Sequence, residues 1–223
     1  MRVAVVIGGG GPPAVARPDL GDLGEAPLVV AADSGLAGAH ALGLDVDVVV
    51  GDMDSVDPAL LAAAAAAGTP VERHPAAKEA TDLDLAVDAA LARGAGRLVV
   101  VTGTGDRFDH ALAMALSLAA DRLASVAVEA WIGPAHLWVV RDRLAFGRPP
   151  GMLVSLVPAH GPARGVTTAG LLYPLGGDDL DPGTTRGVSN VLTGRAATVE
   201  VEEGVLLVIA PIGVGGWAAG SAG

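Results

Sequence analysis

The sequence predicts an α/β protein: a doubly wound, mostly parallel sheet in the N-terminal part, followed by a small all-β sandwich or barrel. Up to about residue 140, short runs of valine, leucine and isoleucine alternate with stretches of helical periodicity. This pattern is typical of strands that are buried on both faces of a parallel sheet and connected by helices. Beyond that point, short strand-like runs are separated by Gly, Pro and Asp clusters, and no helical pattern recurs.

In the N-terminal part, the expected strands are Val3–Ile7, Leu28–Ala32, Val46–Val50, Pro70–Arg73, Arg97–Thr102 and Val126–Ile132. The expected helices between them are Gly35–Leu42, Pro58–Ala67, Asp82–Arg93 and Asp109–Leu123. In the third helix, Leu83, Val87 and Leu91 recur at a spacing of four and form an apolar face. Alternation of this kind implies right-handed crossovers and therefore a doubly wound layer.

In the C-terminal part, the expected strands are Leu144–Phe146, Met152–Val157, Gly165–Leu172, Thr184–Ser189, Ala196–Glu202 and Val205–Ile209. Clusters such as Gly176-Gly177-Asp178-Asp179 are predicted to be turns between them. We therefore expect an α/β domain over residues 1–142, a β domain over residues 143–212 and a disordered tail over residues 213–223.

The charge balance and the absence of cysteine exclude several classes of function. Among the 223 residues, 25 are acidic and 14 are basic, which gives a formal net charge of −11, and cysteine is absent. Without cysteine there can be no disulfide, thiolate zinc site or thiol nucleophile. The negative charge argues against a nucleic-acid partner, because nothing in the chain would displace counterions from a phosphate backbone. An acidic protein can still bind a polyphosphate when a metal cation mediates the contact.

No segment predicts export or membrane insertion. The apolar run at the N-terminus is too short for a signal-peptide core and ends in glycines. The longest uncharged stretch, residues 205–223, is interrupted by Pro211 and several glycines, whereas a spanning helix needs roughly 20 mostly apolar residues. We therefore expect a soluble, cytoplasmic protein.

In an open α/β sheet, ligands bind beyond the carboxyl ends of the strands. The segments that follow the expected strands there are Gly8–Pro13, Asp33–Gly35, Gly51–Ser55, Lys78–Asp82 and Gly103–His110. All but the first of these carry at least one aspartate. One such aspartate is usually a helix cap, but several converging on one edge predict a ligand site there.

Asp52 and Asp54 form the sharpest pair. In an extended segment, positions i and i+2 point to the same side, so two carboxylates would offer hard oxygen ligands to Mg²⁺. The alternative is that Asp52, Asp54 and Ser55 satisfy backbone amides of a turn or cap. Taken alone, the residues favour neither interpretation over the other.

The residues around the third and fourth helices offer further candidates. Thr81 and Asp84 match a capping box, which leaves Asp82 able to face the site. Lys78 is the only lysine in the chain and is suited to a phosphate, although a solvated lysine is the simpler interpretation. Arg107 and Asp109 open a helix after a glycine-containing loop, which favours phosphate binding. His110 fits an ordinary helix histidine better than a general base.

Two common nucleotide motifs are absent. The run Gly8–Gly11 is followed by Pro12 and Pro13 and does not complete a dinucleotide-binding fingerprint. No Gly-Lys-Ser/Thr sequence exists, so a phosphate-binding P-loop is excluded. Near the end of the β part, Ser189 and Asn190 close an expected strand, where ordinary turn chemistry is the favoured interpretation.

Taken together and in order, these segments resemble the thiamine pyrophosphokinase (thiamine diphosphokinase) family. The resemblance extends from about Asp33 to Asn190 and rests on Asp33-Ser34-Gly35, Gly51-Asp52-Met53-Asp54-Ser55, Lys78-Glu79-Ala80-Thr81-Asp82, Gly105-Asp106-Arg107-Phe108-Asp109-His110 and Gly187-Val188-Ser189-Asn190. The sequence departs from the family pattern at four positions. The two aspartates that flank the lysine in the family are here Ala77 and Glu79. A second glycine before the arginine is here Asp106, and the asparagine that commonly follows the start of the next helix is here Met114.

The resemblance implies that pyrophosphate is transferred from ATP to thiamine, giving thiamine diphosphate and AMP. It implies that Mg²⁺ is held by Asp52, Asp54 and Asp82. Binding of ATP and its phosphates falls to Asp33, Lys78, Thr81, Arg107 and Asp109, and binding of thiamine to Ser189 and Asn190.

The resemblance further implies a homodimer in which the β domain of one subunit and the α/β domain of the other share each active site. Two alternatives are kept. The first is a non-catalytic sensor of thiamine or a nucleotide on the same fold, and the second is a metal-dependent phosphohydrolase.

Overall fold

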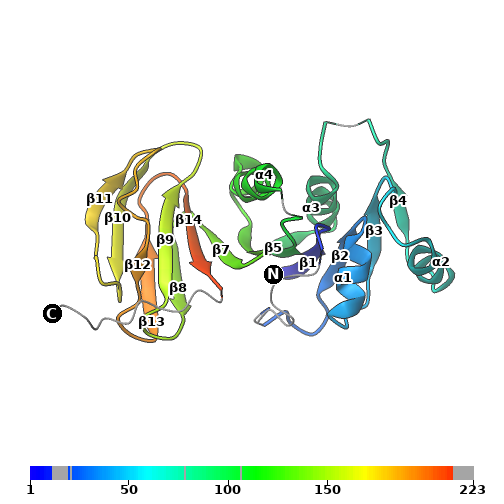
Figure 1. Ribbon diagram of the computed structural model, residues 1–223, viewed down its shortest axis with the longest axis horizontal. Coiled ribbons are helices and arrows are strands. Elements are labelled where there is room, and N and C mark those ends of the chain that lie inside the picture. The colour runs from blue at the N-terminus through cyan, green and yellow to red at the C-terminus, as the bar shows by residue number, and fades with distance from the viewer. Residues whose placement is uncertain (12–19, 21, 78, 106, 213–223) are drawn as a thin grey trace. The chain divides into compact units, whose positions relative to one another are not determined.

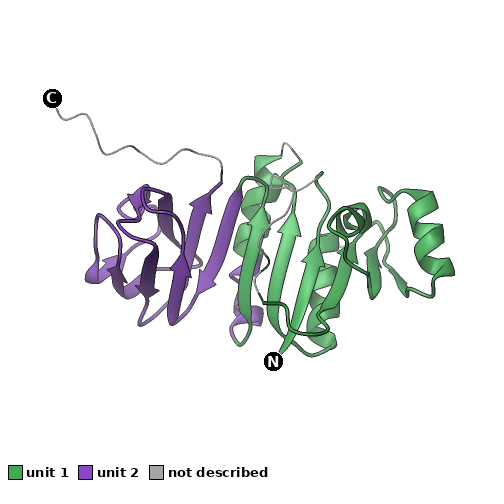
Figure 2. Ribbon diagram, turned by 90° about the horizontal axis from the view of Figure 1, so that it is seen from below, with its two compact units in different colours: residues 1–117, 125–134 green, residues 118–124, 135–223 purple. Residues whose placement is uncertain are grey.

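The computed structural model describes residues 1–11, 20, 22–77, 79–105 and 107–212, so Lys78, Asp106 and the expected tail from residue 213 lie outside the described residues. The chain divides into two compact units, shown in Figure 2. Unit 1 comprises Met1–Ser117 and Ser125–Pro134, and unit 2 comprises Leu118–Ala124 and Ala135–Gly223. The expected boundary at residue 142 concerns functional domains and stays a prediction. Among the described residues, no helix combines the length and apolar character that a membrane span requires.

Unit 1 is built on a parallel sheet with the strand order β6-β5-β1-β2-β3-β4. Figure 1 labels its strands β5, β1, β2, β3 and β4. Its strands are β1 (Arg2–Ile7), β2 (Leu28–Ala32), β3 (Val48–Gly51), β4 (Val71–Arg73), β5 (Ala95–Thr102) and β6 (Ala127–Ile132). The inner strands are buried along most of their length. This confirms the interpretation of continuous apolar runs as strands covered on both faces.

The helices of unit 1 confirm the predicted alternation. They are α1 (Gly35–Ala41), α2 (Pro58–Ala66), α3 (Asp82–Ala92) and α4 (Phe108–Leu118). Asp57 caps α2, since its carboxylate accepts hydrogen bonds from the amides of Ala59 and Leu60. Helix α3 packs against β1, β2, β3 and β5, whereas α1 packs against β1 and β2.

The strand order reverses at β1, which is the topological switch point of the sheet. It proceeds outward from β1 through β2 and β3 to β4, and then returns to place β5 on the other side of β1. In a sheet of this kind the crevice outside the carboxyl ends of the strands at the switch point is the usual ligand site. The loops after β1 and β5 are therefore expected to line it.

Unit 2 contains two antiparallel sheets, with orders β12-β9-β14-β7 and β11-β10-β13-β8. Their strands are β7 (Ala135–Val140), β8 (Arg143–Gly147), β9 (Leu153–Pro158), β10 (Ala163–Ala169), β11 (Gly176–Leu180), β12 (Asn190–Val191), β13 (Ala196–Glu200) and β14 (Leu206–Pro211). One buried cluster draws on both sheets, with Val154 and Val208 from one and Val166 and Val199 from the other. The prediction of a small β-sandwich is therefore confirmed.

Two sequence predictions for unit 2 are wrong in detail, and one strand was missed. Residues 184–189 form hydrogen-bonded turns rather than a strand, because the Thr184 hydroxyl accepts from the amide of Arg186 and the Val188 amide donates to Thr185. The segment Gly176–Leu180, expected to be a turn, pairs with β10 as a strand, and β7 was not predicted. In β7 and β11, pairing with neighbouring strands overrides local propensity.

The fourth predicted helix also ends early. Helix α4 stops at Leu118, and a short 3₁₀ turn, η1 (Asp121–Leu123), follows. The Arg141 guanidinium donates to the carbonyl oxygens of Ala119 and Ala120 at 2.6 and 3.0 Å. These bonds satisfy carbonyl groups that a continuing helix would otherwise have used.

Candidate active site

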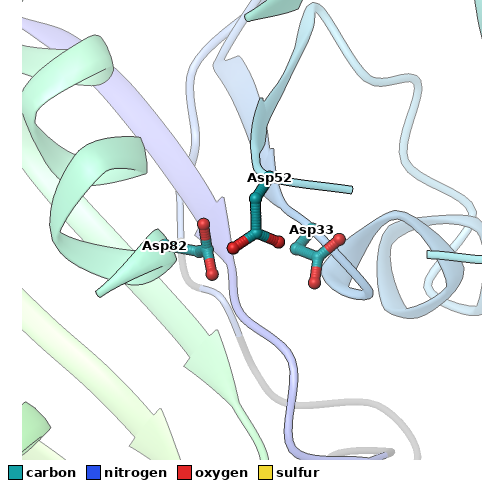
Figure 3. Close-up of side chains that lie close together, drawn as sticks. All are labelled: Asp33, Asp52 and Asp82. Atoms are coloured by element: carbon teal, nitrogen blue, oxygen red, sulfur yellow. The ribbon is translucent and has the colours of Figure 1, made fainter. Parts of the chain in front are cut away.

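Three carboxylates converge at the carboxyl edge of the sheet in unit 1. Asp33 follows β2, Asp52 follows β3, and Asp82 is the first residue of α3. Each offers an oxygen atom, and these three atoms all lie within 4.8 Å of one another. In Figure 3, the Asp52 carboxylate lies between those of Asp82 and Asp33. We call Asp33, Asp52 and Asp82 the acidic trio.

Asp33 is the buried member of the acidic trio. It is 5% exposed, and its backbone adopts a left-handed conformation with φ of 47°. Its amide donates to the carbonyl of Val50 at 2.9 Å, which fixes it to the end of β3. The hydroxyl of Ser55 donates to Oδ2, whereas Oδ1 is buried and has no hydrogen-bond partner among the described residues. A buried carboxylate oxygen of this kind calls for a cation or a donor from a ligand.

Gly51 makes room for the acidic trio. Its φ is 148°, and a Cβ at this position would lie 3.0 Å from Oδ1 of Asp82 and 3.1 Å from Cβ of Asp33. Only glycine adopts this backbone conformation without strain and leaves the space open. The glycine that precedes the paired aspartates therefore has a steric role as well as a role in turning the chain.

Asp54 lies outside the acidic trio. The sequence predicts an extended segment in which Asp52 and Asp54 point to the same side, but Met53 adopts a left-handed φ of 67° and turns the chain between them. Asp54 is exposed, and its amide donates to Oδ1 of Asp52 at 3.2 Å. The negative charge of Asp52 is the main cause that raises the pKa of the Asp54 carboxyl.

The capping prediction for α3 is confirmed. Thr81 is the N-cap, and its hydroxyl accepts the amide of Asp84 at 3.1 Å and donates to Oδ2 of Asp84 at 2.8 Å. Asp82 begins the first turn and is half-buried in the acidic trio. The cap therefore stabilises the N-terminal turn of α3, which carries Asp82 of the acidic trio.

A cavity of about 580 Å³ adjoins the acidic trio, and Asp33 and Asp82 are in its wall. Further lining residues are Gly9, Gly10, Ser34, Ser55, Thr81, Asp84, Thr102, Gly103, Thr104, Gly105, Arg107, His110, Ala113, Met114 and Ser117. The volume is in the range of sites that bind small molecules. Sequence reasoning considered Ser55 only as a turn or cap residue and missed Thr102 and Ser117, because single hydroxyl residues in these two positions carry no motif.

The glycine run after β1 forms part of the cavity wall by approaching the loop after β5. The amides of Gly103 and Gly105 donate to the carbonyls of Gly9 and Gly10, each at 3.0 Å. A Cβ on Gly103 would lie 2.0 Å from the carbonyl oxygen of Gly10. The buried hydroxyl of Thr102 donates to the carbonyl of Gly9 at 2.9 Å. The glycines therefore serve close packing of two loops at the switch point.

Arg107 and Asp109 pair with each other on the surface. The guanidinium donates to both carboxylate oxygens, at 3.2 Å from Nε and 2.5 Å from Nη2. The hydrogen bond from Arg107 is the main cause that lowers the pKa of Asp109 to about 2. Only Arg107 of the two is in the cavity wall, so Asp109 orients the arginine in this structure.

The predicted thiamine residues lie in unit 2. Ser189 is exposed, has a left-handed φ of 60° and donates its amide to the hydroxyl of Ser155 at 3.1 Å. Asn190 is buried and is bonded to the main chain of Tyr173. Tyr173, which sequence reasoning did not select, is 55% exposed. The signal that was available is that Tyr173 is the only tyrosine in a chain with few aromatic residues.

Two family models match the chain. The thiamin pyrophosphokinase catalytic domain matches residues 23–128, and the thiamin pyrophosphokinase vitamin B1 binding domain matches residues 144–206. Together they cover most of the chain. The catalytic model matches the α/β part and the vitamin B1 binding model matches the β part, in the expected order. No curated protein sequence matches the chain at a significant level.

Solved structures with the same fold include thiamine pyrophosphokinases from bacteria and yeasts. That from Geobacillus thermodenitrificans has a TM-score of 0.74 and 26% identity, covering 95% of this chain and 97% of its own. The Bacillus subtilis structure has a TM-score of 0.79 and 24% identity, covering 95% and 99%. The Candida albicans structure has a TM-score of 0.73 and 14% identity, covering 94% and 89%. The two family models, matched in order along one chain with this fold, show that the chain belongs to the thiamin pyrophosphokinase family.

Proposed function

We propose that this chain transfers the pyrophosphoryl group of magnesium-bound ATP to thiamine, and that Asp33, Asp52 and Asp82 hold the metal. The observation that carries the metal assignment is the buried Oδ1 of Asp33. It has no hydrogen-bond partner among the described residues and belongs to a trio whose oxygens lie within 4.8 Å of one another. Like charges at this separation repel, and a divalent cation removes the repulsion.

The donors fit magnesium. All three are carboxylates, which are hard oxygen ligands of the kind that Mg²⁺ binds together with water and phosphate oxygens. Gly51 leaves a space among them that a Cβ would fill. Asp54 lies beside the acidic trio, its pKa raised chiefly by the charge of Asp52, and we assign it to the edge of the same site.

In the reaction, a new bond forms between the hydroxyl oxygen of thiamine and the β-phosphorus of ATP. The bond from that phosphorus to the oxygen that remains on AMP breaks, and the hydroxyl proton leaves. Magnesium, when bound, neutralises charge on the phosphate oxygens.

The protein aligns the two substrates for this reaction. The packed glycine loops and the hydroxyl of Thr102 shape the cavity wall, and Arg107 supplies a cation whose orientation Asp109 fixes. Lys78, which lies outside the described residues, is a second candidate cation for the phosphates.

We assign the thiamine acceptor site to unit 2, which corresponds to the vitamin B1 binding model. In the described part of unit 2, the large apolar side chains exposed to solvent are those of Leu172, Tyr173 and Val188, at 49%, 55% and 45%. An aromatic ring and two aliphatic side chains suit the flat rings of thiamine, and the thiazolium charge favours a tyrosine face. We call these three residues the acceptor surface, and Ser189 adjoins it in sequence.

We further propose that the active protein is a homodimer with shared active sites. Exposed apolar side chains in unit 1 support this proposal, because Phe108 is 79% exposed and Leu112 is 47% exposed on α4. Light scattering at several protein concentrations tests it. A monomer with full activity would contradict the shared site.

The first experiment measures AMP release with thiamine, ATP and Mg²⁺, and with each omitted in turn. We expect release only when all three are present. Release without thiamine would instead support a phosphohydrolase, and thiamine binding without any release would support a sensor. In the variants Asp52→Asn and Asp82→Asn, we expect turnover to fall by at least about 100-fold with the fold retained. Asp54→Asn should show whether the exposed aspartate belongs to the same set.

A further inference from the structure

The side chain of Asn190 is committed to the main chain. It is 3% exposed, and Oδ1 accepts the amide of Tyr173 at 3.0 Å and the amide of Val191 at 2.9 Å. Its Nδ2 donates to the carbonyl of Tyr173 at 2.7 Å. Both lone pairs of the oxygen are therefore in use, and the amide group imitates a partner strand for Tyr173.

These bonds fix one end of the segment that connects β10 to β11. The same end is held by a bridge between Leu171 and Leu192 and by the Leu172 amide, which donates to the carbonyl of Val191 at 2.9 Å. The other end is held at Leu175, whose amide donates to the hydroxyl of the buried Thr168 at 2.9 Å. The main chains of the exposed Leu172 and Tyr173 are themselves part of the first attachment, so their side chains project from a fixed backbone.

The residues that precede Asn190 in the chain, Val188 and Ser189, are also exposed. Ser189 adopts a left-handed backbone, and its amide is held by the hydroxyl of Ser155. Val188 precedes it with 45% of its surface exposed. Asn190 is thus the residue at which the two segments of the acceptor surface are joined by side-chain hydrogen bonds.

We propose that Asn190 is a positioning residue of the acceptor site, which acts on thiamine through Tyr173 rather than by contacting it. This inference rests on the proposed acceptor surface. The geometry requires an amide at position 190, since one group must both accept from the amide and donate to the carbonyl of the same residue. A carboxylate of the same size retains the acceptor and loses the donor.

A double-mutant cycle with Asn190→Ala and Tyr173→Ala tests the proposal, with AMP release measured at varied thiamine and at varied ATP. We expect each single substitution to raise the KM for thiamine by about tenfold, a loss of contact energy of ordinary size. The double variant should lie within about threefold of Tyr173→Ala, because the two substitutions remove the same contact. The KM for ATP and kcat at saturating thiamine should change by less than about threefold.

A matched control separates positioning from general loosening of unit 2. Val140 is buried in the same core, but it lies in β7, which β9 and β14 separate from β12 and Asn190, and Val140→Ala destabilises the same sandwich. We expect its KM for thiamine to stay within about twofold of the wild type. If Asn190→Ala fails to fold, Asn190→Asp replaces it in the cycle, because it keeps the volume and the acceptor.

If the KM increases of the two single variants multiply in the double variant, Asn190 contacts thiamine independently of Tyr173, and the proposal is overturned. An unchanged KM for thiamine in a folded Asn190 variant, or an equal rise in Val140→Ala, would also overturn it. If the wild type releases no AMP with thiamine, ATP and Mg²⁺, the proposed function fails, and this result is distinct from all of these.

Discussion

Gly51 and Asp82 are in a contact that only a glycine at position 51 permits. A Cβ on Gly51 would approach Oδ1 of Asp82 to 3.0 Å while the backbone holds φ at 148°. The glycine comes from the end of β3, and the carboxylate comes from the start of α3. The separation of strand and helix at the site is therefore set by the absence of one carbon atom.

We expect Gly51→Ala to lower kcat by at least about tenfold, because the methyl group displaces Asp82 and small displacements of reacting groups are costly. AMP release measures the effect. Gly68→Ala is the matched control, since Gly68 also has a positive φ but a Cβ added there would have no neighbour within 4 Å. Equal loss of activity in both variants would attribute the effect to backbone strain alone.

Asp33→Asn should abolish the stabilisation of the protein by Mg²⁺ without lowering its stability in the absence of metal. In the absence of metal, we expect the variant to unfold at the same temperature as the wild type or higher, because one of three repelling charges is removed. In the presence of millimolar MgCl₂, the melting temperature of the wild type should rise and that of the variant should not. Thermal melts with and without MgCl₂ decide this, and an equal rise in both would exclude Asp33 as a ligand.

Thr81→Ala should weaken the start of α3. Loss of the N-cap hydroxyl costs about 1 kcal/mol in the free energy of unfolding, and it frees the turn that carries Asp82. Urea denaturation measures the stability, and AMP release measures the accompanying fall in kcat. Thr81→Ser keeps the hydroxyl and should restore both quantities, so a serine variant as impaired as alanine would contradict the cap as the cause.

His136 makes unit 2 sensitive to acid. It lies in β7, 4% exposed, and its ring stacks on that of Trp138 with centroids 3.9 Å apart. The Arg148 guanidinium contacts its Nδ1 and lies over the Trp138 ring at 5.2 Å. Burial is the main cause that lowers the pKa of His136 to about 3, and the charge of Arg148 adds to it.

In the unfolded chain, His136 takes up a proton below its ordinary pKa of about 6.5. In the folded chain it stays neutral down to about pH 3. Between these values the unfolded state binds more protons, so stability is full above about pH 6.5 and falls as the pH is lowered. Between pH 7.5 and pH 5 this group should remove about 2 kcal/mol from the free energy of unfolding. Denaturation of the wild type and His136→Gln at both pH values tests this, and identical losses would refute it.

The elements of unit 1 could be predicted because local pattern and tertiary environment agree there. Leu28–Ala32 is both an apolar run and a strand buried on both faces, and the predicted and observed helices α1, α2 and α3 start at the same residues. Unit 2 departs from local rules. Gly176–Leu180 has the composition of a turn, and only its pairing with β10 makes it a strand.

The candidate site was predicted in outline by one rule, that aspartates after parallel strands meet at the same edge. That rule indicates Asp33, Asp52 and Asp82 equally. It cannot indicate that Met53 turns the chain and removes Asp54 from the trio, because a left-handed φ at a methionine has no sequence signature. Nor does a motif distinguish a side chain that contacts a ligand from one, like Asn190, whose bonds go to the main chain.

The central place of β1 in its sheet has a consequence for synthesis of the protein. β1 is synthesised before the other described strands of its sheet, yet one of its two edges pairs with β5, which begins only at Ala95. Until that strand is made, the sequence Val3–Ile7 presents an open edge of mostly β-branched residues, which is a hazard for pairing with other chains. Nascent chains truncated before residue 95 should therefore aggregate or recruit chaperones, whereas chains that include β5 should not.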